Sequence, residues 1–145
     1  MKILITGASG FIGLSVVKSL LKEGYKVMAL SRKTPEKNSS IDINWIEADL
    51  SKIETYREKI ITFAPDIVIY LAWQDIPDFS FETSQKNLNH AINFFSIILA
   101  MGCCKKILVS GSDKELNLPK GVCFESDKGD PNNGFSWSKH AIRSW

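Results

Sequence analysis

Apolar runs of strand length alternate with longer stretches of helical periodicity along this chain, and this alternation limits the possible folds more than any other feature. It is the pattern of βαβ units, in which a helix connects each strand to the next parallel strand. The sequence therefore predicts an α/β fold around a parallel sheet. The five predicted strands are Lys2–Thr6, Lys26–Ser31, Ile43–Ala48, Asp66–Ala72 and Lys106–Ser110.

Helical periodicity and the residues that end helices predict the segments between the strands. An apolar stripe that begins at Ile12 stops at Gly24, a residue suited to a helix C-cap. The other predicted helices are Ser51–Phe63, ended by Pro65, then Phe81–Met101, closed by Gly102, and a terminal helix in "NGFSWSKHAIRSW" that is cut short. The polar segment Ser31–Ser40 is predicted to be a loop, as is most of Ser112–Asn133.

The predicted helix Phe81–Met101 is apolar almost all round in its second half, "AINFFSIILAM". A helix that covers one face of a sheet does not need so much apolar surface. Two interpretations follow: a deeply buried core helix, or a helix that also packs against a partner subunit.

Composition excludes several classes of function. The 145 residues carry a net charge of +2 and the basic residues are scattered, so we expect neither a nucleic-acid nor a membrane partner. Cys103, Cys104 and Cys123 form no CxxC unit and have no histidine cluster, so we expect free thiols and no metal site. Without a signal peptide or an apolar stretch long enough to span a bilayer, one soluble cytoplasmic domain is expected.

The segment "TGASGFIG" places three glycines between the first predicted strand and the first predicted helix. Gly7 permits a tight turn, Gly10 lets the backbone approach a pyrophosphate, and Gly13 lets the helix pack closely on the strand. The amides at the helix N-terminus then face the phosphates of a dinucleotide. The alternative is a tight βα turn without a ligand. A nucleoside-triphosphate loop is excluded, since no Gly-Lys-Ser/Thr follows at the required spacing.

The end of the second predicted strand indicates which dinucleotide would bind. Binders of NAD usually carry an acidic residue there, which bonds the ribose 2′-hydroxyl. This chain has Arg32 and Lys33 instead, two cations that suit the 2′-phosphate of NADP. The alternative is a solvated loop with ordinary charges, which leaves NAD as the other candidate.

Several segments together resemble the extended short-chain dehydrogenase/reductases, specifically the NAD(P)-dependent nucleotide-sugar epimerase/dehydratase group. "TGASGFIG" matches that family's TGxxGFIG loop, "ADL" its Asp-Leu after the third strand, and "DIVIYLAW" is similar to its D-x-V-x-H-L-A-A strand. "KNLNHAINFF" and "KKILVSGSDKEL" resemble its asparagine helix and the strand before its catalytic serine or threonine. The resemblance implies a Rossmann-type doubly wound sheet of about five strands in the order 3-2-1-4-5, with helices on both faces.

The resemblance also implies roles for individual residues. Asp49 would bond the adenine amine, Leu50 would pack on the ring, and Asn87 would support the site from the third helix. Ser112 aligns with the family serine or threonine that bonds the substrate, with Ser110 as the alternative. For each of these the other interpretation is a residue with local bonds alone. From the residue patterns and the resemblance together, the expected cofactor-binding residues are Gly7, Ser9, Gly10, Phe11, Ile12, Gly13, Arg32, Lys33, Asp49, Leu50, Leu71, Ala72, Asn87 and Lys139.

The family's Tyr-x-x-x-Lys motif is incomplete in "GFSWSK". Lys139 is present, and the resemblance implies that it holds the nicotinamide ribose, but the position of the tyrosine, the family's general acid/base, is Phe135. Phenylalanine has no proton to exchange. Trp73 and Tyr70 also replace an alanine and a histidine of the family pattern, and Lys114 interrupts the Asp-Glu pair of the dehydratases, which disfavours dehydration.

Three hypotheses remain open. The chain is an NADP-dependent enzyme acting on a nucleotide sugar, with Ser112, Lys139 and a substitute base, Asp113 or Glu115. Or it is a non-catalytic dinucleotide-binding domain, or a module that dimerises through its third and terminal helices. Family members carry a substrate domain after the lysine, so residues 1–145 are expected to be the dinucleotide-binding part, either a fragment or a shortened relative.

Overall fold

A computed structural model describes residues 1–34, 43–116 and 122–145 of the chain. Two compact units are present. The first consists of Met1–Ala72 and Asn93–Val109, and the second of Trp73–Ile92 and Ser110–Trp145. The predicted loops Ser31–Ser40 and Ser112–Asn133 lie partly outside the described residues, at 35–40 and 117–121 respectively.

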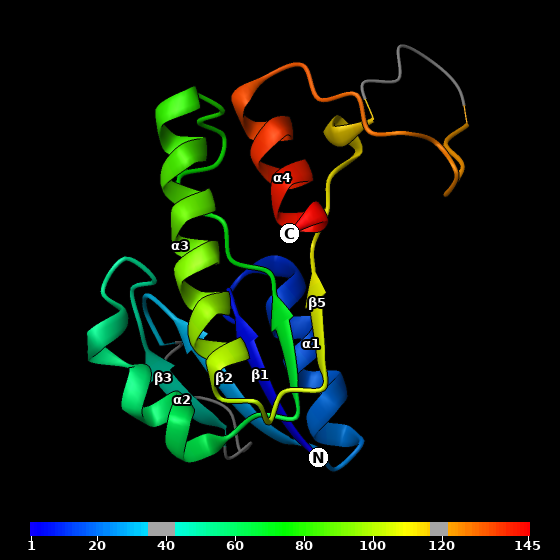
Figure 1. The fold of residues 1–145 in the computed structure, drawn as a ribbon. Coiled ribbons are helices and arrows are strands. Elements are labelled where there is room, and N and C mark those ends of the chain that lie inside the picture. The colour runs from blue at the N-terminus through cyan, green and yellow to red at the C-terminus, as the bar shows by residue number, and fades with distance from the viewer. Residues whose placement is uncertain (35–42, 117–121) are drawn as a thin grey trace. The chain divides into compact units, whose positions relative to one another are not determined.

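The first unit holds one parallel sheet in the order β3-β2-β1-β4-β5 (Figure 1). Ile3 in the central strand pairs with Val27 on one side and Ile67 on the other. This order and the parallel pairing confirm the predicted doubly wound sheet. The strands are β1 (Lys2–Thr6), β2 (Lys26–Ser31), β3 (Asn44–Glu47), β4 (Ile67–Tyr70) and β5 (Lys106–Val109), of which β3, β4 and β5 are shorter than predicted.

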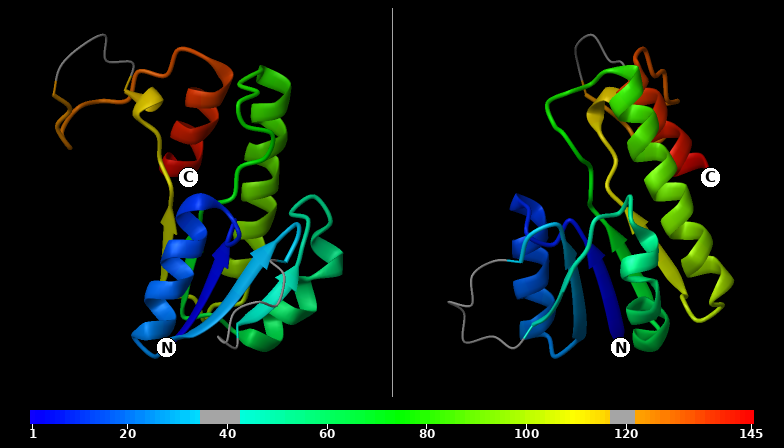
Figure 2. Two further views of the ribbon diagram at one scale, coloured as in Figure 1. Left: turned by 180° about the vertical axis from the view of Figure 1, so that it is seen from behind. Right: turned by 90° about the vertical axis from the view of Figure 1, so that its left-hand side faces the viewer.

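Helices cover both faces of this sheet, as expected. The right-hand view of Figure 2 shows α1 (Phe11–Lys22) on one face, with α2 (Arg57–Phe63) and the last part of α3 (Phe81–Ala100) on the other. Gly24, at φ +77°, ends α1: the amides of Gly24 and Tyr25 donate back into its last turn, as in a Schellman motif.

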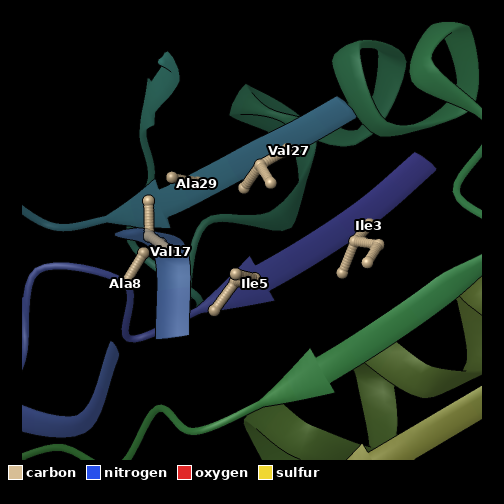
Figure 3. Close-up of a cluster of buried hydrophobic side chains, with 6 residues drawn as sticks. All are labelled: Ile3, Ile5, Ala8, Val17, Val27 and Ala29. Atoms are coloured by element: carbon tan, nitrogen blue, oxygen red, sulfur yellow. The ribbon is translucent and has the colours of Figure 1, made fainter. Parts of the chain in front are cut away.

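The core beneath α1 is a small set of aliphatic side chains. Because successive residues of a strand point to opposite faces, alternate positions of β1 and β2 project toward the same helix. Figure 3 shows Val17 of α1 directed at these positions. This burial fixes α1, and with it the loop that precedes α1, against the sheet. The members are Ile3, Ile5, Ala8, Val17, Val27 and Ala29.

The prediction of one continuous helix from Ser51 to Phe63 is wrong. A short 3-10 turn at Ile53–Thr55 comes first, and α2 begins only at Arg57, because Tyr56 between them has non-helical dihedrals (φ −130°, ψ −5°). The Tyr56 side chain is fully buried and its hydroxyl donates to the carbonyl of Leu50, so its burial overrides helical propensity. As predicted, the helix ends just before Pro65, at the left-handed Ala64.

The apolar second half of α3 is buried on one face and not all round. Phe94 and Phe95 pack their rings against Tyr70, with centroids 5.5 and 4.9 Å away. Leu99, however, is 56% exposed. A deeply buried core helix is therefore the wrong interpretation of the pattern, and the interpretation that involves a partner subunit stays a prediction. No helix in the described part of the chain is long and apolar enough to cross a membrane.

The second unit contains the first part of α3, the 3-10 turn Asp113–Glu115 and α4 (Gly134–Ser144). Asn133 caps α4: its side-chain oxygen accepts from the backbone amide of Ser136, and its backbone amide donates to the Ser136 hydroxyl. This capping box fixes where α4 starts, and therefore which side chains lie on its buried face. Phe135 and Lys139, one turn apart, are both on that face.

Candidate functional site

The glycine loop between β1 and α1 has a backbone that excludes side chains at two positions. Gly7 has a φ of +66°, and a Cβ there would lie 2.9 Å from the Ala72 backbone nitrogen. A Cβ on Gly13 would lie 2.2 Å from the Gly7 carbonyl oxygen. The loop therefore folds tightly onto both the end of β4 and the first turn of α1.

Gly10 differs from the other two glycines because its backbone excludes a side chain less strictly. Its φ of −74° is open to any residue, and a Cβ would meet only the Gly7 carbonyl, at 3.2 Å. Gly10 is the N-cap of α1, where no side chain caps the helix and no acidic residue lies in the first turn. Phe11, the next residue, is 96% exposed. An anion could approach this helix end closely, which is the role that the sequence predicts for it.

The end of β2 is joined to the glycine loop by hydrogen bonds. The Ala8 amide donates to the carbonyl of Leu30, and the hydroxyls of Ser9 and Ser31 are hydrogen-bonded to each other. Ser31 also donates to the carbonyl of Lys33 at 2.8 Å. The structure therefore brings the exposed residues Arg32 and Lys33 next to the glycine loop, as an adenosine-binding edge requires.

The remaining predicted residues of the first unit follow the next strands along the same edge. Asp49 comes after β3, where its carboxylate accepts from the amide and hydroxyl of Ser51, and Leu50 is buried. After β4, the amides of Leu71 and Ala72 donate to the carbonyl and hydroxyl of Thr6. Ligands of doubly wound sheets bind at the carboxyl ends of the strands, where all of these residues lie.

Asn87 belongs to the second unit, on α3. It is 5% exposed, and its amide donates to the carbonyls of Gln74 and Thr83 while its oxygen accepts from the Gln74 amide. These bonds use both donors and one acceptor of the side chain to hold the segment that follows Trp73. These bonds are all to backbone groups of the protein itself, so the predicted role of Asn87 in supporting the cofactor site stays a prediction.

Lys139 is 6% exposed and fully engaged within the second unit. Its Nζ donates to the Ser110 carbonyl at 3.0 Å and to the Ser110 hydroxyl at 3.4 Å, and it lies 4.4 Å from the centre of the Trp73 ring. Burial lowers the pKa of the Lys139 ammonium to about 8, and the negative charge of Glu115 opposes that shift.

The serine that contacts Lys139 is Ser110, the alternative, and not Ser112. The Ser112 hydroxyl instead accepts from the Lys114 amide and donates to Asp113, so it caps the 3-10 turn. Its predicted part in substrate binding therefore stays a prediction.

Phe135, at the position of the family tyrosine, lies inside an aromatic cluster. Its ring is 5.1 Å from that of Trp73 and 4.9 Å from that of Phe79, both edge-to-face. The sequence indicated that Trp73 is bulky, but no local pattern could indicate that it contacts both Phe135 and Lys139.

Glu115, one of the two predicted substitute bases, is 2% exposed. Its Oε1 accepts from the Ser112 amide at 2.7 Å, while Oε2 is buried without a hydrogen-bond partner in the described chain. The spacing Ser-x-x-Glu is that of a capping box, a signal in the sequence that could have found this arrangement. Asp113, the other candidate, is exposed. No group of three or more His, Cys, Asp or Glu in the described ranges could hold a metal.

Together the sheet order and the glycine loop define a Rossmann-type nucleotide-binding domain. Residues 3–145 match the NAD dependent epimerase/dehydratase family, so the chain belongs to that family, as the sequence motifs predicted. It is 26% identical over 146 residues to the dTDP-6-deoxy-L-talose 4-dehydrogenase (NAD(+)) of Aggregatibacter actinomycetemcomitans, covering 99% of this chain and 53% of that protein. A shorter match, 43% over 54 residues (36% of this chain, 18% of the relative), is to the CDP-abequose synthase of Salmonella muenchen.

Solved structures share the fold at lower identity. The UDP-Glc/GlcNAc 4-epimerase of Campylobacter jejuni superposes with a TM-score of 0.83 at 21% identity, over 99% of this chain and 47% of that one. The UDP-glucose 4-epimerase of Thermus thermophilus, in complex with NAD, gives 0.81 at 24% identity over 99% and 49%. The chain thus spans about half the length of these proteins.

Proposed function

We propose that this chain is the dinucleotide-binding part of a cytoplasmic protein that modifies nucleotide sugars. We further propose that it binds NADP in preference to NAD. The glycine loop carries the proposal. A side chain is excluded at Gly7 and Gly13 by backbone contacts, whereas at Gly10, at the uncapped N-terminus of α1, a Cβ would need only a small shift of one backbone oxygen 3.2 Å away. The fold constrains Gly10 less than the other two, and a ligand that needs the space would explain the glycine there.

The preference for NADP rests on Arg32 and Lys33. Both are exposed, and both follow the strand whose last residue, Ser31, is bonded to the glycine loop. A dinucleotide seated on the loop would extend its adenosine ribose toward this end of the sheet. Two cations there favour a 2′-phosphate over a 2′-hydroxyl.

The relatives support a nucleotide sugar as the substrate class. Their names describe enzymes of dTDP-, CDP- and UDP-linked sugars, and the chain spans about half or less of their length. In the longer protein of which this chain would be a part, we expect the sugar nucleotide to be bound by the portion after residue 145 together with the dinucleotide-binding part. Lys139 would hold the nicotinamide ribose, and Ser112 would face the substrate.

With Phe135 in place of tyrosine, we expect the chain to bind the cofactor without transferring protons by the usual route. A second candidate is an active enzyme with a substitute acid/base. The buried carboxylate of Glu115 favours this candidate, because its Oε2 has no hydrogen-bond partner among the described residues and its charge raises the pKa of Lys139. This candidate would be supported if the intact protein oxidised or reduced a nucleotide sugar and Glu115→Gln abolished that activity. If the intact protein showed no turnover, the binding function would remain.

We also propose a homodimer through α3 and α4. Trp137 on α4 and Trp145, the C-cap residue that follows α4, are 63% and 59% exposed. Exposed tryptophans favour a protein contact. Sedimentation at micromolar concentration should give twice the mass of the chain, and a monomeric mass would contradict the proposal.

The cofactor proposal is tested by titrating the intact protein with NADPH and NADH. We expect saturable binding of both, tighter for NADPH, and a loss of binding in Gly10→Ala. If Gly10→Ala bound as tightly as the wild type, the glycine loop would not be the site.

A further inference from the structure

We propose that Trp73 is a positioning residue that keeps the Lys139 ammonium engaged inside its own unit, so that any ligand hydroxyl must compete with the indole ring for it. The engagement of Lys139 does not depend on any cofactor, whereas its consequence for cofactor affinity rests on the proposed function.

The partners of Lys139 match the capacity of an ammonium group. An ammonium has three N–H donors. Two hydrogen bonds go to the carbonyl and hydroxyl oxygens of Ser110, and the ring face of Trp73 lies within the distance at which a cation and an aromatic ring attract each other. With Lys139 only 6% exposed, water adds little to this set. The lysine is therefore satisfied without a ligand.

The position of the Trp73 ring is not explained by a hydrogen bond of its own. Its Nε1 is buried and has no partner among the described residues. The ring packs edge-to-face on Phe135, with centroids 5.1 Å apart at 79°, and its face contacts the ammonium of Lys139. Phe135 in turn packs edge-to-face against Phe79. Trp73, Phe135 and Lys139 thus form one packed group, in which a change at one residue is expected to alter the others.

Two residues of this group therefore differ from what a working Tyr-x-x-x-Lys site needs: Phe135, which lacks the hydroxyl, and Trp73, which holds the lysine. Phe135→Tyr would restore a hydroxyl, but Lys139 would still be held by Trp73. A smaller residue at position 73 would free the ammonium even with Phe135 in place. Position 73 is therefore expected to set how available the lysine is.

The test measures the reactivity of Lys139 without a cofactor. The intact protein is treated with a small amine-acylating reagent at one fixed pH, and the modification of Lys139 is followed by peptide mass spectrometry relative to exposed lysines. We expect Trp73→Ala to raise the acylation rate of Lys139 roughly fivefold or more, in line with the strength of a desolvated cation–π contact. Trp73→Phe, which keeps a ring face, should retain most of the protection. Trp137→Ala, which removes an exposed indole from α4, should change nothing.

Unchanged acylation of Lys139 in folded Trp73→Ala would overturn the proposal. If Trp73→Ala does not fold, Trp73→Leu keeps apolar bulk without a ring and is judged by the same two results. NADPH affinity should rise in parallel with acylation, by a similar factor. If no variant binds NADPH but Lys139 becomes more reactive, the proposed cofactor function fails while this inference stands.

Discussion

The Nζ of Lys139 lies 3.0 Å from the carbonyl oxygen of Ser110, across 29 positions of sequence, and this bond within the second unit joins α4 to the segment that leads to the 3-10 turn Asp113–Glu115. Burial of this ammonium affects the free energy of unfolding. The same burial lowers the pKa of Lys139 to about 8, close to physiological pH.

The first prediction concerns stability and pH. Burial lowers the pKa of Lys139 from 10.5 to about 8 in the folded chain. Below about pH 8 both states are protonated, and the buried charge has its full unfavourable effect. Between about pH 8 and pH 10.5 the folded state has lost the proton and the unfolded state has kept it, so folding becomes more favourable as the pH rises.

Lys139→Met removes this dependence. Going from pH 7 to pH 10, we expect the free energy of unfolding of the wild type to gain up to about 3 kcal/mol on that of the variant, since each pKa unit corresponds to about 1.4 kcal/mol. Chemical denaturation at several pH values measures the difference, with the exposed Lys114→Met as control. A difference between wild type and Lys139→Met that does not vary with pH would contradict the lowered pKa.

The second prediction separates two glycines of one loop. Gly13→Ala forces a Cβ to within 2.2 Å of the Gly7 carbonyl, so we expect a loss of at least about 3 kcal/mol or no folded protein. Gly10→Ala meets the same oxygen at 3.2 Å, so we expect less than about 1 kcal/mol. Thermal melting of both variants measures the two losses, and equal destabilisation would contradict the expected difference between Gly13 and Gly10.

The third prediction concerns the choice of cofactor. Arg32→Ala should weaken NADPH binding roughly tenfold and leave NADH binding unchanged, because a charge-assisted contact to the 2′-phosphate is lost. Lys18→Ala, an exposed cation of α1, is the control for net charge. Equal loss of affinity for NADPH and NADH would argue that Arg32 acts on the loop and not on the phosphate.

A fourth prediction concerns the buried carboxylate. Glu115→Ala removes the acceptor of the Ser112 amide at a site that is 2% exposed, and we expect a loss of about 2 kcal/mol. Glu115→Gln keeps an acceptor oxygen and should lose less, and the exposed Asp113→Asn should be within about 0.5 kcal/mol of the wild type. Destabilisation as large in Asp113→Asn would mean that burial of Glu115 is not the cause.

Sequence patterns correctly predicted those features of the structure that depend on residues close together in the chain. The turn at Gly7 and the shared face of Phe135 and Lys139 follow from spacing along the chain, and the structure has both. The helix predicted from Ser51 was wrong at Tyr56, because tertiary burial of that ring outweighed the helical pattern. The contact of Trp73 with Lys139 joins residues far apart in the sequence, and no spacing rule reaches that far.

The central claim is that the glycine loop binds a dinucleotide, and calorimetric titration of the intact protein with NADPH tests it most directly. We predict saturable binding with one NADPH per chain, and at least roughly tenfold weaker binding in Gly10→Ala, a variant expected to stay folded. No binding of NADPH or NADH by the folded wild type, or equal binding by Gly10→Ala, would contradict the claim.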